Sequence, residues 1–136
     1  MATNGDLPDL PPEALARAEA ALAGLADRYM DWATADAARL CACLDEVLAP
    51  GADLAILLPR LFTISHDMKG QAATFGYPLV SELGNRLCRL IDGAGAAPTA
   101  ELLSRAAGLV DRMGLVIALR LEGDGGDRGR ALLAEP

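Results

Sequence analysis

The chain has 136 residues, a length typical of one domain with a core of its own. Hydrophobic residues make up 52% of it but aromatic residues only 4%, and the apolar content is mostly Ala and Leu, which favours helices over sheets. The formal net charge of −7 repels phosphate backbones and anionic lipid headgroups, so nucleic acid and membrane surfaces are excluded as expected partners.

The sequence indicates a cytoplasmic protein. The N-terminal stretch has no basic region followed by an apolar core, and no segment offers about 18 uncharged apolar residues for a membrane span. Cys41, Cys43 and Cys88 form no even set for disulfides, and the two neighbours lie about 200° apart around a helix, where they could not bind one metal together. We interpret all three as small apolar fillers in a reducing compartment.

In chain order, residues 1–11 are rich in Pro, Gly and Asp and are expected to be flexible. The following segment, up to Leu48, keeps apolar residues in steps of three and four, which is the period of an amphipathic helix. These residues are Leu15, Ala18, Leu22, Leu25, Tyr29, Ala33, Ala37, Leu40, Leu44 and Val47. Because Gly24 and a cluster of polar residues interrupt the segment, we expect a short leading helix followed by a longer one.

Three more helices are predicted after the turn at 49–53. The first has an apolar seam from Leu54 to Phe75, the second begins at Pro78 and ends at the turn "DGAGAAP", and the last runs from about Thr99 to Leu121. Residues 122–136 are expected to form a flexible tail. Residues 12–121 are therefore predicted to form an all-α, antiparallel four-helix bundle with an additional N-terminal helix.

The third predicted helix carries the only histidine and the only lysine of the chain, His66 and Lys69. The buried seam of this helix is centred about 120° from His66, so the imidazole is expected at the seam's edge with a nitrogen in solvent. One face is shared by Phe62, His66, Lys69, Gly70 and Ala73, whereas Arg60, Asp67 and Gln71 point further round toward water.

This face is unusual for a helix surface. Gly70 costs a helix interior about 1 kcal/mol relative to Ala, so something is expected to come close there. Phe62 lies on the accessible side, where an aromatic ring serves a partner more than a monomer. A lone exposed His or a lone Gly is most often incidental, but together with Lys69 they indicate a nucleophilic imidazole that carries an anion.

The spacing of His66, Lys69, Gly70 and Gly76, with Met68 and Leu83 at apolar positions, resembles the H-x-x-K-G-x-x-x-x-x-G signature of histidine-containing phosphotransfer (HPt) domains. The resemblance extends in helix number, helix length and motif position over roughly residues 28–121. It implies an HPt-like four-helix bundle that takes a phosphoryl group from a receiver-domain aspartate and passes it to another receiver.

By this resemblance, His66 is the phosphoacceptor and Lys69 stabilises the phosphoryl charge. Phe62, Gly70, Gln71 and Ala73 would dock the partner, and Gly76 would shape the helix end. The chain would need no cofactor of its own, because Mg²⁺ belongs to the receiver, and its partners would be response-regulator receiver domains or a hybrid histidine kinase. We expect a monomeric phosphoryl carrier without autokinase activity, since no P-loop or ATP-binding pattern is present. Asp67 departs from the family, in which many members have an uncharged residue.

Two other functions remain open. A non-catalytic helical adaptor would bind its partner through Phe62 and the apolar rim, with His66 incidental. The dimerisation and phosphoacceptor half of a sensor kinase would have an acidic residue after the histidine, as Asp67 is here, but Lys69 and Gly70 replace the rest of that pattern and no ATPase domain follows. Loss of labelling in a His66→Gln variant would argue against the adaptor.

Overall fold

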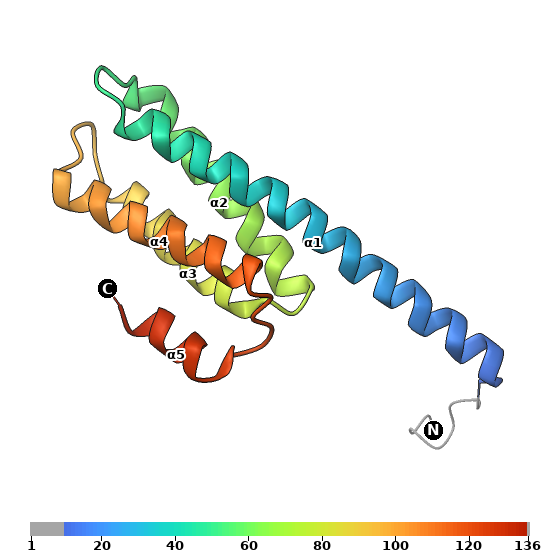
Figure 1. Ribbon diagram of the computed structural model, residues 1–136. Helices are drawn as coiled ribbons and strands as arrows, with labels where there is room; N and C mark the ends of the chain where they lie inside the picture. Colours follow the sequence, from blue (N-terminus) through green and yellow to red (C-terminus); the bar gives the residue numbers. More distant parts are fainter. Residues whose placement is uncertain (1–9, 136) are drawn as a thin grey trace, which may run out of the picture.

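The computed structural model describes residues 10–135, and these residues form an all-helical structure without a strand (Figure 1). The helices are α1 (Pro12–Leu48), α2 (Leu54–Thr74), α3 (Pro78–Asp92), α4 (Ala100–Ala118) and α5 (Gly126–Ala134). The predicted all-α class is thus confirmed for the described part of the chain. Three of the predicted starts hold: α2 follows Asp53, α3 begins at Pro78, and Thr99 caps α4 by accepting the Leu102 N–H at 3.1 Å.

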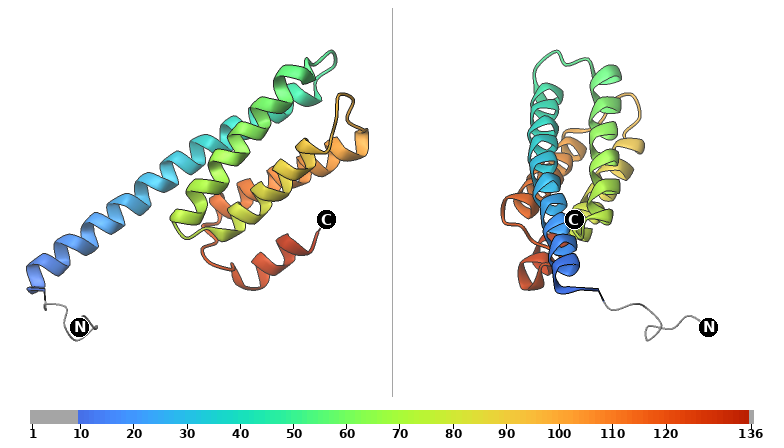
Figure 2. Two further views of the ribbon diagram at one scale, coloured as in Figure 1. Left: turned by 180° about the vertical axis from the view of Figure 1, so that it is seen from behind. Right: turned by 90° about the vertical axis from the view of Figure 1, so that its right-hand side faces the viewer.

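Four helices pack around a main apolar core, and Val47, Leu57 and Leu58 form a second, smaller cluster. α2 contacts α1 and α3, and α4 contacts α3 and α1, so the contacts close a ring (Figure 2). We call residues 29–118 of this arrangement the helical body. Its centre contains fully buried side chains from every helix of the ring: Leu40, Leu61, Leu83, Leu87, Val110 and Met113. Leu40 lies on the apolar stripe predicted for α1 and Leu61 on the seam predicted for α2, because a spacing of three and four residues keeps one face of each helix turned inward.

α1 is a single helix of 37 residues, so the predicted break into a short and a longer helix is wrong. Gly24 lowers helix stability by only about 1 kcal/mol, and the Ala and Leu residues around it are strong helix formers. The N-terminal half of α1 extends well beyond the other helices (Figures 1 and 2). Of the segment expected to be flexible, residues 1–9 lie outside the described part, and Leu10 and Pro11 lead directly into the helix.

The C-terminal segment also differs from the expectation. Residues 122–136 were predicted to be a flexible tail, but α5 forms there and packs against α3. Gly129 allows the close turn before it, because a Cβ at this position would lie 1.7 Å from the Asp124 carbonyl oxygen. Leu132 and Leu133 pack against the main core.

Two arginines of the helical body hold the C-terminal end of α5. Arg86 Nη1 donates to the carbonyl of Leu133 at 2.9 Å, and Arg112 Nη1 donates to that of Leu132 at 2.8 Å. Both also donate to the Glu135 carbonyl, at 3.2 and 3.1 Å. The last carbonyls of a helix have no partner within the helix and carry a partial negative charge, so cations stabilise this end. Sequence periodicity could not show these bonds because the partners are 20 to 49 residues apart.

An aromatic cluster closes the end of the helical body from which α1 extends. The Tyr29 ring stacks on Phe75 with centroids 4.8 Å apart and lies 5.3 Å from the Tyr77 ring. Tyr29 is 2% exposed. This burial, followed by the nearby Tyr77 hydroxyl, raises the pKa of Tyr29 to about 12, so its neutral form is favoured in the folded protein.

The three cysteines have different environments. Cys43 and Cys88 are buried, as expected of apolar fillers, but Cys41 is exposed and the filler interpretation is wrong for it. Residues that are two positions apart lie about 200° apart around a helix axis. Cys41 therefore points outward because Cys43 faces the core. Burial raises the pKa of the Cys43 thiol, and partial desolvation by its neighbours, followed by the charges of Asp111 and Asp45, raises the pKa of the exposed Cys41 thiol, so neither favours the reactive thiolate.

Candidate functional site

The second half of α2 presents His66 to solvent. Ser65 and Met68 on either side of it face the core and are 0% and 3% exposed, so the helix is fixed with His66 turned outward. The Ser65 hydroxyl donates to the Gly84 carbonyl of α3 at 3.0 Å. The His66 side chain is 59% exposed, as expected at the edge of the seam.

Phe62 supports the imidazole from one turn earlier. The two rings are stacked, with centroids 5.9 Å apart and an interplanar angle of 16°. Phe62 is half-buried, and its carbonyl accepts a weak bond from the Cys88 thiol at 3.9 Å. The aromatic ring therefore lies nearly parallel to the imidazole, while most of the imidazole remains exposed to solvent.

Lys69 lies over the junction of α2 and α3 and keeps an uncompensated charge. Its ammonium donates to Asn85 Oδ1, a neutral acceptor, at 3.2 Å. Within residues 10–135, no carboxylate lies at ion-pair distance from this ammonium. The Lys69 carbonyl accepts a 2.7 Å hydrogen bond from the Ser81 hydroxyl, which fixes the backbone from which the side chain starts.

Gly84 lets the two helices approach closely beneath Lys69. A Cβ at this position would come within 3.1 Å of the Lys69 Cβ and 3.4 Å of the Ser65 carbonyl oxygen. Sequence reasoning missed Gly84, Asn85 and Ser81, because their roles depend on the register between α2 and α3. A glycine inside the leucine-rich seam of α3 was the one available signal.

The other side of His66 faces α1. Asp67 Oδ1 lies 3.9 Å from His66 Nδ1, beyond hydrogen-bond distance. Gln71 and Asp67 line a hollow of about 200 Å³ with Asp36 and Arg39 of α1, and Trp32 lines a second one with Gln71. Gln71 thus belongs to the α1 side of the face, whereas Lys69 belongs to the α3 side.

The small residues predicted around His66 lie where a partner can approach. Gly70 and Ala73 are exposed, and a Cβ at Gly70 would meet no atom within 4 Å. Gly76 follows the end of α2 with φ +86°, a conformation that favours glycine. The Tyr77 N–H then donates to the Ala72 carbonyl at 2.9 Å, a helix-ending bond of the Schellman type.

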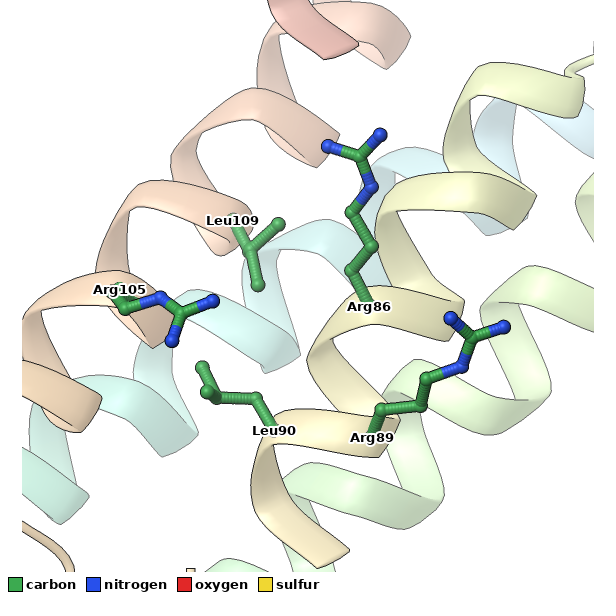
Figure 3. Close-up of a pocket in the computed structure, with 5 residues that line it drawn as sticks. All are labelled: Arg86, Arg89, Leu90, Arg105 and Leu109. Carbon is green, nitrogen blue, oxygen red and sulfur yellow. The ribbon is translucent and has the colours of Figure 1, made fainter. Parts of the chain in front are cut away.

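A hollow of about 420 Å³ between α3 and α4 is separate from this face (Figure 3). Its walls carry three guanidinium groups around two leucines: Arg86, Arg89, Leu90, Arg105 and Leu109. It shares no residue with the predicted site, and Arg86 is already bonded to α5. In residues 10–135 no three His, Cys, Asp or Glu residues are grouped to hold a metal ion.

The protein-family models, the curated proteins and the solved structures contain no match to this chain. Among residues 10–135, no helix combines the length and the apolar character that a membrane crossing requires.

Proposed function

We propose that this chain is a histidine phosphotransfer protein, which accepts a phosphoryl group on His66 from a receiver aspartate and passes it to a second receiver. One observation carries the proposal: an exposed imidazole is followed, one helical turn later, by Lys69, whose ammonium bonds to a neutral acceptor and has no carboxylate at ion-pair distance within residues 10–135. A phosphoryl group on His66 would bring the negative charge that this ammonium lacks.

We also propose that the fold is an antiparallel four-helix bundle of the HPt kind. The closed ring of contacts among α1, α2, α3 and α4 and their short connections support it. In place of the expected additional N-terminal helix, α1 itself is extended, and the further helix, α5, follows the ring.

The transfer step needs one nucleophile from this chain. A lone pair of the neutral His66 imidazole attacks the phosphorus of the receiver's aspartyl phosphate, the bond from phosphorus to the carboxylate oxygen breaks, and its electron pair returns to the carboxylate. The Asp67 carboxylate lies on the Nδ1 side, so Nε2 is the nitrogen at which a phosphoryl group meets less repulsion. The second receiver's carboxylate reverses the step.

The surroundings of His66 suit an approaching acidic pocket. The open space at Gly70 and the short side chain of Ala73 provide room one and two turns beyond the imidazole. Phe62 and Gln71 would contact the partner on either side. The receiver, or the receiver of a hybrid kinase, would bring the Mg²⁺ and the acidic residues that hold it, so this chain supplies the nucleophile and the docking face.

The test is transfer of labelled phosphate from purified phosphorylated receiver domains to the protein. We expect label that is lost in acid, kept in alkali and absent from His66→Gln. His66 is exposed, so this variant should keep the thermal unfolding curve of the wild type. Label retained in His66→Gln would refute the proposal, and receiver binding without any transfer would establish the adaptor.

A further inference from the structure

The part of α1 that extends beyond the helical body carries an unpaired apolar stripe. Leu15, Leu22 and Leu25 are 48%, 65% and 40% exposed, and Ala18 completes a spacing of three and four residues. This stripe continues the line of Tyr29, Ala33 and Leu40, which face the core. It is therefore the inner face of the helix, continued past the end of its own partners.

A helix that packs on this stripe must have a matching spacing of apolar residues and a matching length. Seventeen residues, 12–28, extend for about 25 Å at 1.5 Å per residue. Positions 15, 18, 22 and 25 are the a and d positions of a heptad, and Ala14 and Ala21 flank them at g, which allows a close approach of a second helix. The same stripe on another copy has this repeat and this length.

The position of the helical body determines the direction of such a pair. Each body lies on the same side of its α1 as the stripe, so two parallel helices would place both bodies in one space (Figure 2). Antiparallel helices place the bodies at opposite ends of the paired segment. Leu15 then lies opposite Leu25 of the partner subunit, and Ala18 lies opposite Leu22 of the partner subunit.

Two features at the edge of the body fit the end of this pair. The hollow of about 200 Å³ beside the aromatic cluster, lined by Tyr29, Phe75, Tyr77, Arg120 and Glu122 among others, lies where the helix start of a second copy arrives. Leu10, 57% exposed just before the helix, has the size and character to enter it.

We propose that the chain forms an antiparallel, two-fold symmetric homodimer through residues 12–28 of α1 and Leu10 just before it. This inference replaces the monomer expected from the sequence. The interface excludes α2, so both copies of His66 remain accessible, unlike a dimer of the sensor-kinase type formed through the phosphoacceptor helices. It does not depend on the proposed phosphotransfer, which can succeed or fail independently.

Sedimentation velocity of the full chain over a range of concentrations tests the proposal. We expect a species of twice the 14.1 kDa chain mass that dissociates on dilution. Leu22→Glu should raise the dissociation constant by at least about 100-fold, because each dimer loses two buried leucines. Ile56→Glu is the matched control, since Ile56 is 57% exposed on the surface of α2 at the far end of the body. A chain that stays monomeric, or a dimer that Leu22→Glu leaves intact, overturns the proposal.

Disulfide formation tests the antiparallel direction. In a Cys41→Ser background, which removes the exposed native thiol, Ala21→Cys lies near the two-fold axis and should cross-link to its copy under mild oxidation. Ala14→Cys lies about 18 Å from the same residue of the partner subunit along the axis and should remain reduced. Cross-linking of both variants would indicate parallel helices, and cross-linking of neither would place the interface elsewhere; either result overturns the proposed arrangement.

Discussion

The charge of Lys69 is the feature of the site most open to a direct test. Asn85→Asp keeps the size of the side chain that accepts the Lys69 hydrogen bond at 3.2 Å, but makes the acceptor a carboxylate. Two unit charges at this distance attract by about 1 kcal/mol in a water-like dielectric and by about 5 kcal/mol at an effective dielectric of 20. Because Lys69 is only part-buried, we expect the lower end of this range.

If pairing with Asp at position 85 removes about 1–2 kcal/mol of the attraction between Lys69 and the phosphoryl group, the equilibrium constant for phosphoryl transfer to His66 falls by about 5- to 30-fold. Mixing each variant with a limiting amount of labelled phosphorylated receiver, and measuring the label on both proteins at equilibrium, gives this ratio. Asn85→Ala is the control, because it removes the acceptor without adding a charge and should stay within about threefold of the wild type. Transfer by Asn85→Asp equal to that of the wild type at low salt would show that the Lys69 charge does not stabilise the phosphoryl group.

Three further outcomes follow from individual residues. Gly70→Ala should stabilise the protein to denaturant by up to about 1 kcal/mol, because its Cβ meets no atom within 4 Å, yet slow transfer; faster transfer would contradict the proposed clearance. Tyr29 loses its proton at pH about 12 in the folded protein and near pH 10 in the unfolded chain, so its contribution to the free energy of unfolding is complete below pH 10. This contribution should fall by about 2–3 kcal/mol as the pH rises to 12. An equal fall in the free energy of unfolding of Tyr29→Phe would show that the titration of Tyr29 is not its cause. Trp32, 49% exposed in the hollow that Gln71 also lines, should shift its fluorescence to shorter wavelength when a tryptophan-free receiver binds, and transfer without any shift would place docking away from α1.

The sequence could predict the orientation of α2 because that orientation depends on local periodicity. Steps of three and four residues identify Leu61, Ser65 and Met68 as the buried face, and the position of His66 relative to them follows from the helical angle alone. The exposed imidazole and the aromatic ring one turn before it are properties of one helix. The predicted starts of α3 and α4 likewise depend on single residues, Pro78 and Thr99.

Features that join distant segments could not be predicted in this way. The bonds of Arg86 and Arg112 to the carbonyls of α5 require a tertiary arrangement that no helical period specifies. The continuity of α1 depended on the small energetic difference between a helical glycine and a bend, which neighbouring residues decide. The stripe from Leu15 to Leu25 was correctly read as apolar, but only the lengths of the other helices show that it lies outside the core.

The register between α2 and α3 positions the Lys69 side chain over the junction of these helices. Gly84 allows the close crossing, the Ser65 hydroxyl bonds to its carbonyl, and the Ser81 hydroxyl bonds to the carbonyl of Lys69 one turn further along. A methyl group at Gly84 would press on the Lys69 Cβ at 3.1 Å, so either the helices separate or the lysine stem turns away from Asn85. This small-residue crossing is therefore the structural feature that fixes the stem of Lys69 and, with it, the charge that the proposed phosphotransfer requires.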